Sequence, residues 1–417
     1  MEFELQPVTE PGRQMVDLAE KHAADFATRA AEHDRDGTFA FENVVEMRNS
    51  GFVAAAVPRD LGGMGVTSVH DSIVAMSRLG RAEGSTPLAF TMHLFRTLGL
   101  VRGLQTATAN GNQTRQTRLE GVLKKIGTGE LVITVANSER GADIRTSRTT
   151  ATRVEGGWLF NGNKTFATGS PAADLLAVRA RYENEKGELR LGTTMAPVDR
   201  PGVEIMNNWD GLGMRASGSH DVVFTDYFVP EDEFDDIGEF GKFNSPLLAL
   251  ASGSSLGLAS VFLGIAESAN EIAVNSIMER GAANYPMNQA TTAENEIDLT
   301  AMRGILSRAA HSIDEDARVN YAAGSVSSRD GMSEMEAFRI IKNSAVAKKF
   351  VMDHSGKIVD RAITLFGGGG FMNNSVLARL YRDVRAGPLM QPWASNQAIE
   401  LIGKVALGLN PNKGQPK

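Results

Sequence analysis

The sequence predicts an α+β multidomain protein with an N-terminal all-α domain (1–130), a central β-barrel or sandwich domain (131–232) and a C-terminal four-helix bundle (233–417). Apolar residues recur at helical spacing from Gln14 to Gly129, and short β-branched and aromatic runs replace this pattern up to about Val229. The helical spacing then returns and continues nearly to the end. A chain of 417 residues is also larger than one compact core usually serves.

The helical pattern of the first part is clear in two stretches. Met15, Leu18 and Ala19 begin one apolar stripe, and Ile73, Met76 and Leu79 form another. Turn residues such as Asp36-Gly37 separate the stretches. We therefore expect several helices with one apolar face each.

The middle part has the composition of short strands bounded by turns. Leu131–Val135, Leu175–Ala180 and Leu189–Met195 are rich in β-branched and apolar residues. Two glycine-containing sites, Glu155-Gly156-Gly157 and Asn161-Gly162, are typical of hairpin turns. The predicted β unit has about 100 residues, which is an ordinary domain size.

Long helical stretches predict a bundle in the last part, at residues 259–280, 294–323 and 335–363. One uncharged run, Leu247–Ala266, has the length of a membrane span. Four serines and three glycines lower its hydrophobicity, so we interpret it as a core helix whose small residues allow close helix packing. The chain is expected to be non-membrane.

Composition excludes several classes of function. The net charge of -7 gives no reason to expect nucleic acid as a partner. The chain has no cysteine, which excludes disulfides, thiolate nucleophiles and iron–sulfur clusters and suits the cytoplasm. No paired histidines stand at metal-ligand spacing, so no metal site is predicted.

Four segments carry a resemblance to a known family. They are Gly51–Gly65 with its Pro58…Gly62-Gly63 turn, Asn161–Thr168 (NGNKTFAT), Trp209–Phe224 with its Leu-Gly-Met-Arg element, and Phe366–Phe371 (FGGGGF) followed by Arg382-Asp383. Their order and spacing resemble those of the acyl-CoA dehydrogenase family. The resemblance extends over nearly the whole chain.

The resemblance implies a flavin, FAD rather than FMN, held between the β domain and the bundle. It places Val135, Ala136, Gly141 and Ala142 along the flavin ring and acyl channel, Phe166 as a wall of the ring, and Thr168 near the reactive nitrogen. Arg280 matches the arginine that pairs with the diphosphate. Phe366, Gly367, Gly368 and Gly369 match a loop that meets the cofactor of a neighbouring subunit, which implies a homo-oligomer, a dimer or tetramer.

Each of these residues also has a plainer interpretation. Val135 and Phe166 could be core residues, and Arg280 could be a solvated helix end. The glycine run could be no more than a turn. No Gly-x-Gly-x-x-Gly fingerprint is present, which argues against an NAD enzyme.

The family's catalytic base is missing. In the family a glutamate follows the Arg-Asp pair, but the ungapped position here is Gln391, and a two-residue insertion would move it to Trp393. The first bundle helix, which supplies the base in some members, has no carboxylate over Pro246–Gly257. The loop Ala136–Asp143 also has alanines where the family has a threonine and a serine.

Three functions remain open on these grounds. The first is α,β-dehydrogenation of an acyl-CoA-type thioester, a small-molecule substrate, with hydride transfer to FAD. The second is a two-component monooxygenase that uses reduced flavin and O2, and the third is a catalytically degenerate assembly subunit. The electron partner could be an electron-transfer flavoprotein, oxygen or a flavin reductase. His93 is a candidate catalytic residue facing the cavity, with a structural histidine as the alternative.

Overall fold

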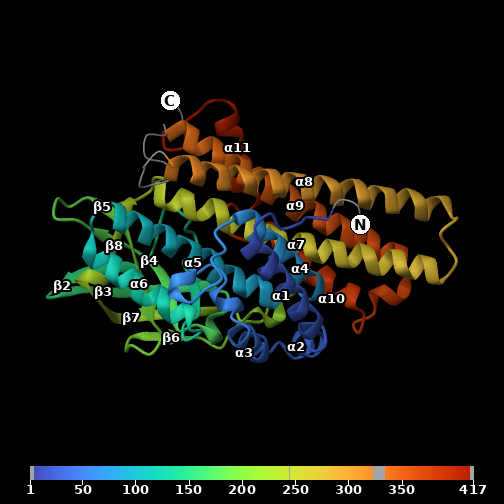
Figure 1. Cartoon of the computed structure of the whole chain (residues 1–417), viewed down its shortest axis with the longest axis horizontal. Coiled ribbons are helices and arrows are strands. Elements are labelled where there is room, and N and C mark those ends of the chain that lie inside the picture. The colour runs from blue at the N-terminus through green and yellow to red at the C-terminus, as the bar shows by residue number, and fades with distance from the viewer. Residues whose placement is uncertain (1–3, 244, 323–333, 414–417) are drawn as a thin grey trace.

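Figure 1 shows a computed structural model of the chain, which describes residues 4–243, 245–322 and 334–413. The predicted order of helices, sheet and helices is confirmed. The helices that precede the sheet are α1 (Glu10–Phe26), α2 (Ala30–Asp36), α3 (Phe41–Asn49), α4 (Val69–Ala82), α5 (Ser85–Ala109) and α6 (Gln113–Gly127).

Local sequence explains where α1 starts. Thr9 caps the helix, because its hydroxyl accepts a hydrogen bond from the Gly12 N–H, and Pro11 occupies the first turn. Asp71 of α4 accepts hydrogen bonds from the Val8 and Thr9 N–H groups. The two helices are thereby fixed to each other at this end.

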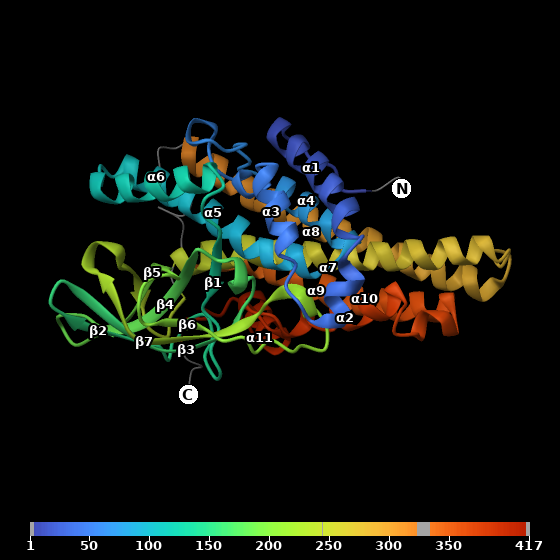
Figure 2. The same cartoon turned by 90° about the horizontal axis from the view of Figure 1, so that it is seen from below.

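The described part of the central domain is an eight-stranded sheet in the order β6-β7-β3-β2-β4-β5-β8, with β1 parallel to β4. Figure 2 shows the sheet beside α5 and α6. The strands are β1 (Ile133–Ala136), β2 (Thr150–Val154), β3 (Gly157–Ala167), β4 (Leu175–Glu183), β5 (Leu189–Pro197), β6 (Val203–Ile205), β7 (His220–Pro230) and β8 (Asp235–Glu239).

Two details of the β prediction were wrong. The sheet continues to Glu239, beyond the expected boundary at 232, because β8 is an edge strand with little apolar pattern that pairs with β5. Asn161-Gly162 is not a hairpin turn but a register shift inside β3. Gly162 is required there, since a Cβ would lie 2.4 Å from Thr149 Oγ1. The turn at Gly156 joins β2 to β3 as predicted.

The C-terminal part is helical, as predicted. Its helices are α7 (Ser245–Glu279), α8 (Pro286–Ala322), α9 (Glu334–Phe366), α10 (Val376–Val384) and α11 (Ser395–Ala406). In Figure 1 the long helices α7, α8 and α9 run side by side and extend away from the sheet. One large core cluster joins them to α1, α4 and α5.

α7 is the central helix of this core. By length and composition it could cross a membrane, but 78% of its most apolar window is buried inside the protein. Glycines allow α4 and α7 to approach closely: a Cβ on Gly264 would lie 2.2 Å from Ser77 O, and one on Gly80 would lie 2.5 Å from Val261 O. The interpretation as a core helix with close packing therefore holds.

Candidate functional site

The residues expected along the flavin ring lie on two adjacent segments, the end of β1 and the end of β3. The Thr165 N–H donates to Ser138 O at 2.8 Å, and the Thr134 hydroxyl donates to Thr168 O. These contacts bring Val135 and Ala136 beside the segment that carries Phe166. The sequence-predicted ring residues are thus gathered in one place.

Phe166 has two features of a binding wall rather than of a core residue. Its φ is +55°, which is unusual for an aromatic residue, and its side chain is 60% exposed. The ring of Trp209 stands edge-on to it, with 6.0 Å between ring centroids. An exposed aromatic face held in a strained backbone conformation is suited to cover a planar ligand, and the core interpretation is excluded.

Thr168 follows Phe166 and is partly exposed. Its hydroxyl is 2.9 Å from that of Ser219, and its N–H donates to Phe166 O. Ser219 belongs to the segment that begins with Trp209. A hydroxyl oriented by a neighbouring serine can offer a hydrogen bond to a ring nitrogen or carbonyl, as the family resemblance implies for this position.

The loop after β1 is held by a buried ion pair. Glu139 Oε1 lies 2.5 Å from Lys164 Nζ and also accepts hydrogen bonds from Thr149. Burial lowers the pKa of Lys164 to about 8; burial would raise that of Glu139, but Lys164 and the hydrogen bonds lower it to about 2. The carboxylate therefore stays charged at neutral pH and fixes the loop.

Three residues of the loop held by this ion pair are placed to contact a ligand. Gly141 is exposed with φ +73°, Ala142 is half-buried, and the buried Asn137 Oδ1 has no hydrogen-bond partner among the described residues. A buried acceptor without a partner is costly unless a ligand satisfies it. The residues that the resemblance places along the flavin ring therefore fit such a ligand: Phe166 could cover it, and polar groups lie nearby to meet its edge.

Arg280 and the glycine loop also come together. Arg280 Nη2 donates to Leu365 O at 2.7 Å, and a Cβ on Gly367 would lie 3.9 Å from Arg280 Nη1. The glycine loop runs from Phe366 through Gly367 into the 3₁₀ turn Gly368–Phe371. In Figure 1 this end of α7 and α9 lies opposite the sheet. The two groups of residues that the resemblance assigns to the flavin are therefore separate within one chain.

The segment at the base position is held by a buried lysine. Lys348 of α9 is 2% exposed, and its amine donates to Met390 O at 2.6 Å and to Pro392 O. Burial lowers the pKa of this amine to about 7. Between these carbonyls stands Gln391, whose buried Oε1 lacks a partner in the described part of the chain. Trp393, with φ +64°, follows.

Sequence reasoning missed Lys348, although the sequence contains a signal. Ile341, Ala345, Lys348 and Met352 follow helical spacing, so the lysine falls on the apolar stripe of α9. A buried lysine on an apolar stripe needs hydrogen-bond acceptors nearby. Here the carbonyls of Met390 and Pro392 are these acceptors, and the lysine thereby holds the 390–393 segment in place.

For His93 the structure favours the structural alternative over the catalytic one. Its Nε2 is 2.8 Å from Val53 O, and its Nδ1 accepts the Ile133 N–H at 3.0 Å. The side chain is 1% exposed, and burial lowers its pKa to about 4. A neutral imidazole with both nitrogens bonded to backbone connects α5 to β1 and has no proton to exchange with a substrate.

The Arg382-Asp383 pair joins domains. Asp383 Oδ1 accepts the Met214 N–H at 2.5 Å, and Arg382 pairs with Asp34 at 2.5 Å. A Cβ on Gly213 would lie 2.2 Å from Arg382 O, so the glycine is required by this close approach. Two of the sequence motifs therefore meet as a structural contact between the sheet and α10.

Comparison with protein families agrees with this architecture. Three family models match: the acyl-CoA dehydrogenase N-terminal domain at 9–102, the middle domain at 133–227 and the C-terminal domain at 253–391. Together they cover most of the chain.

Individual relatives are of two kinds. The chain is 33% identical to the amino sugar nitrososynthase DnmZ of Streptomyces peucetius (97% of this chain, 95% of that protein) and 29% identical to the putative acyl-CoA dehydrogenase YdbM of Bacillus subtilis (90% and 92%). Among solved structures it is similar to KijD3 in complex with FMN and dTDP-3-amino-2,3,6-trideoxy-4-keto-3-methyl-D-glucose, with a TM-score of 0.88, 32% identity and coverage of 98% and 96%. The chain belongs to the acyl-CoA dehydrogenase family of flavin-dependent oxidoreductases.

Proposed function

We propose that this enzyme is a flavin-dependent monooxygenase that oxidises the amino group of a nucleotide-linked amino sugar. The observation that carries the proposal is the neutral Gln391, with a buried and unpartnered Oε1 in the described structure, at the position of the family's carboxylate base. An amide cannot take the α-proton that thioester dehydrogenation must remove.

The same amide suits N-oxidation. A neutral amine attacks an electrophilic oxygen through its lone pair, and Gln391 Oε1 can accept one of its N–H groups while favouring the unreactive ammonium form far less than a carboxylate would. When bound in its reduced form, the flavin would supply the electrons that activate O2 for transfer of one oxygen atom to the amine. Each N-hydroxylation uses one O2 and two electrons from the reduced flavin, places one oxygen atom on nitrogen and releases the other as water.

The relatives support this substrate class. The 33% identity with an amino sugar nitrososynthase covers 97% of the chain, and the KijD3 complex holds an amino sugar attached to dTDP. We infer that this chain takes its flavin in the reduced form from a separate reductase, as a two-component enzyme does. Arg280 with the glycine loop favours FAD, whose adenosine diphosphate half would reach a second subunit.

The test compares two assays on the same purified protein. We expect the dTDP-linked 3-amino sugar, a flavin reductase, NADH and FAD in air to give a product heavier by one oxygen atom, seen by mass spectrometry. We also expect that an acyl-CoA panel does not bleach the bound flavin without air. Bleaching by a thioester would establish the dehydrogenase instead, and a stable protein without flavin or turnover would establish an assembly subunit.

A further inference from the structure

The wall of the predicted flavin site has a second layer, formed by the loop between β6 and β7. Phe166 is 60% exposed, and the ring of Trp209 stands edge-on to it, with 6.0 Å between centroids. Trp209 is partly buried and packs against the large helical core. The position of the exposed Phe166 ring therefore depends on what fixes Trp209.

A histidine holds the backbone of Trp209. The N–H groups of Asn208 and Trp209 donate to Nδ1 of His220, the first residue of β7, at 3.0 and 2.9 Å. A backbone N–H can only donate, so this Nδ1 carries no proton and accepts both hydrogen bonds. His220 also pairs with Ala167, which directly follows Phe166. The histidine thus connects the two segments that carry the wall.

The indole of Trp209 is held separately. Its Nε1–H donates to Met214 O at 3.0 Å, and the Met214 N–H donates to Oδ1 of the buried Asp383 at 2.5 Å. A Cβ on Gly84 would lie 2.9 Å from Met214 Cε, so the methionine is closely packed. A carboxyl group keeps an acceptor oxygen in either protonation state, so this second contact does not depend on a proton.

The contact at His220 does depend on a proton. An imidazolium has a hydrogen on both nitrogens, so a protonated Nδ1 would face two N–H donors and lose both hydrogen bonds. Burial lowers the pKa of His220 below its usual 6.5, although Asp221 raises it, so the ring is neutral at pH 7.5. Four further charged groups stand on the elements around it: Glu204 of β6, Lys164 of β3, and Asp210 and Arg215 of the loop.

We infer that Trp209 is a positioning residue for the flavin wall and that the unprotonated Nδ1 of His220 holds it there, so that tight flavin binding depends on a neutral His220. The Asn208 side chain donates to the Asp221 carboxylate and accepts the Asp221 N–H, both at 3.0 Å, which keeps the loop near β7 in either state. Acid should therefore weaken flavin binding rather than abolish it. The inference concerns the flavin and is independent of the proposed substrate.

The test measures the Kd of FMN for the flavin-free, full-length chain by calorimetry from pH 7.5 to pH 5. His220→Asn is the informative variant, because the asparagine Oδ1 stands close to the place of Nδ1 and accepts hydrogen bonds without titrating. The Kd of the original chain divided by that of His220→Asn should increase about fivefold or more toward pH 5. The FMN phosphate also titrates, with a pKa of about 6, but it does so for both chains and cancels in this ratio.

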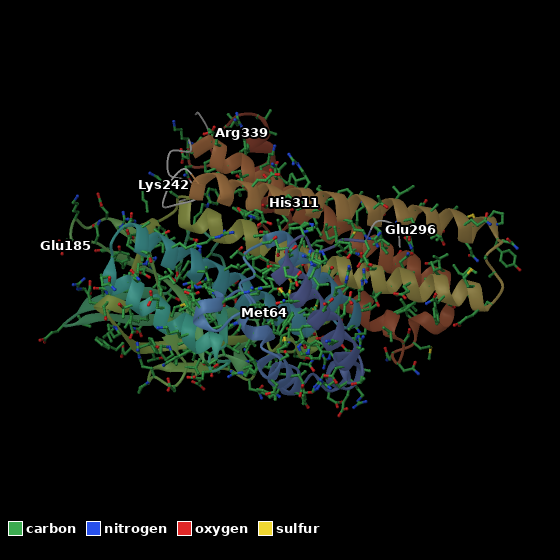
Figure 3. All side chains as sticks on the ribbon, viewed as in Figure 1. Met64, Glu185, Lys242, Glu296, His311 and Arg339 are labelled. Atoms are coloured by element: carbon green, nitrogen blue, oxygen red, sulfur yellow. The ribbon has the colours of Figure 1, made fainter. Side chains whose placement is uncertain are left out.

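Two further variants complete the design. Trp209→Phe loses the indole N–H that binds Met214 O, so it should weaken FMN binding about five- to tenfold at pH 7.5. His311→Asn is the matched control. Burial also lowers the pKa of His311, but this residue lies on α8, away from the sheet (Figure 3), so the variant should follow the original chain at every pH.

Three results would overturn the inference. They are a Kd ratio that stays constant from pH 7.5 to pH 5, FMN binding in Trp209→Phe as tight as in the original chain, and loss of the acid effect in His311→Asn. The last would show that acid acts on the fold as a whole. Failure of the proposed function has a different signature, because it leaves a flavin-loaded protein that does not oxidise the amine.

Discussion

At the residue scale, the central question is what Gln391 does that a glutamate cannot. A carboxylate beside the substrate amine would stabilise its ammonium form and raise its pKa by about one to three units. Gln391→Glu should therefore move the acidic limb of the kcat/KM profile for N-oxidation to higher pH by that amount. Gln391→Ala, the control, should lower kcat/KM without moving the limb. If the acidic limb of the kcat/KM profile does not move in Gln391→Glu, the substrate amine does not lie beside residue 391.

Asp383 makes a second prediction at this scale. Burial raises its pKa from 3.8 to about 7, so the folded state favours the protonated carboxyl. Its contribution to stability is full below pH 3.8 and is lost as the pH rises through 7. Asp383→Asn keeps an acceptor for the Met214 N–H without this loss, so its Tm relative to the original chain should rise between pH 4 and pH 8. If the Tm values of Asp383→Asn and of the original chain stay parallel from pH 4 to pH 8, the pKa of Asp383 is not raised.

At the element scale, α9 positions the 390–393 segment through Lys348. Lys348→Met has similar length but cannot donate to the Met390 and Pro392 carbonyls, so the segment should lose its fixed geometry. We expect kcat/KM for N-oxidation to fall about tenfold or more, because small misplacements near a reacting group are costly. Flavin content should remain, since Lys348 does not belong to the ring-binding residues.

The pH dependence of this variant gives a readout independent of activity. The pKa of Lys348 is about 7 in the folded chain, whereas the ordinary value for a lysine, 10.5, applies in the unfolded chain. Between these two pH values the unfolded chain therefore binds more protons than the folded chain. The original chain should therefore gain stability relative to Lys348→Met as the pH rises from 7 to 10. A constant difference in Tm over this range would show that the amine is not buried.

At the scale of the whole molecule, the two halves of the predicted FAD site lie at opposite ends of one chain. Exposed apolar side chains surround the end with Arg280: Met278 63%, Tyr285 65%, Met287 73%, Phe371 79% and Met372 58%. Such a patch is typical of an interface. We expect a homo-oligomer in which this end meets the flavin of a second subunit.

Phe371→Ser tests this assembly. We expect it to lower the oligomer mass seen by light scattering and to reduce FAD retention several-fold, while Arg280→Ala reduces FAD retention in an intact oligomer. FMN retention, which needs no second subunit, should change little in either variant. A monomeric original chain that holds stoichiometric FAD would contradict the shared site.

Much of this organisation is visible in the sequence, for identifiable reasons. The helical and strand periods predict the three parts, and the glycine motifs mark places where backbone meets backbone, as at Gly213 and Gly264. Long-range side-chain contacts are not encoded by local spacing: His93 looks like a cavity residue until its two backbone partners, Val53 and Ile133, are known. The edge strand β8 was missed because pairing with β5, rather than its own apolar pattern, makes it a strand.

Turnover of the dTDP-linked amino sugar under ¹⁸O2 with a flavin reductase would distinguish N-oxidation from thioester dehydrogenation in one experiment. We expect a product whose new oxygen is ¹⁸O and is bonded to the former amino nitrogen, and we expect less of it from the Gln391→Ala variant. A product without the label, or no oxidised nitrogen while an acyl-CoA bleaches the flavin in the absence of air, would contradict the proposed function.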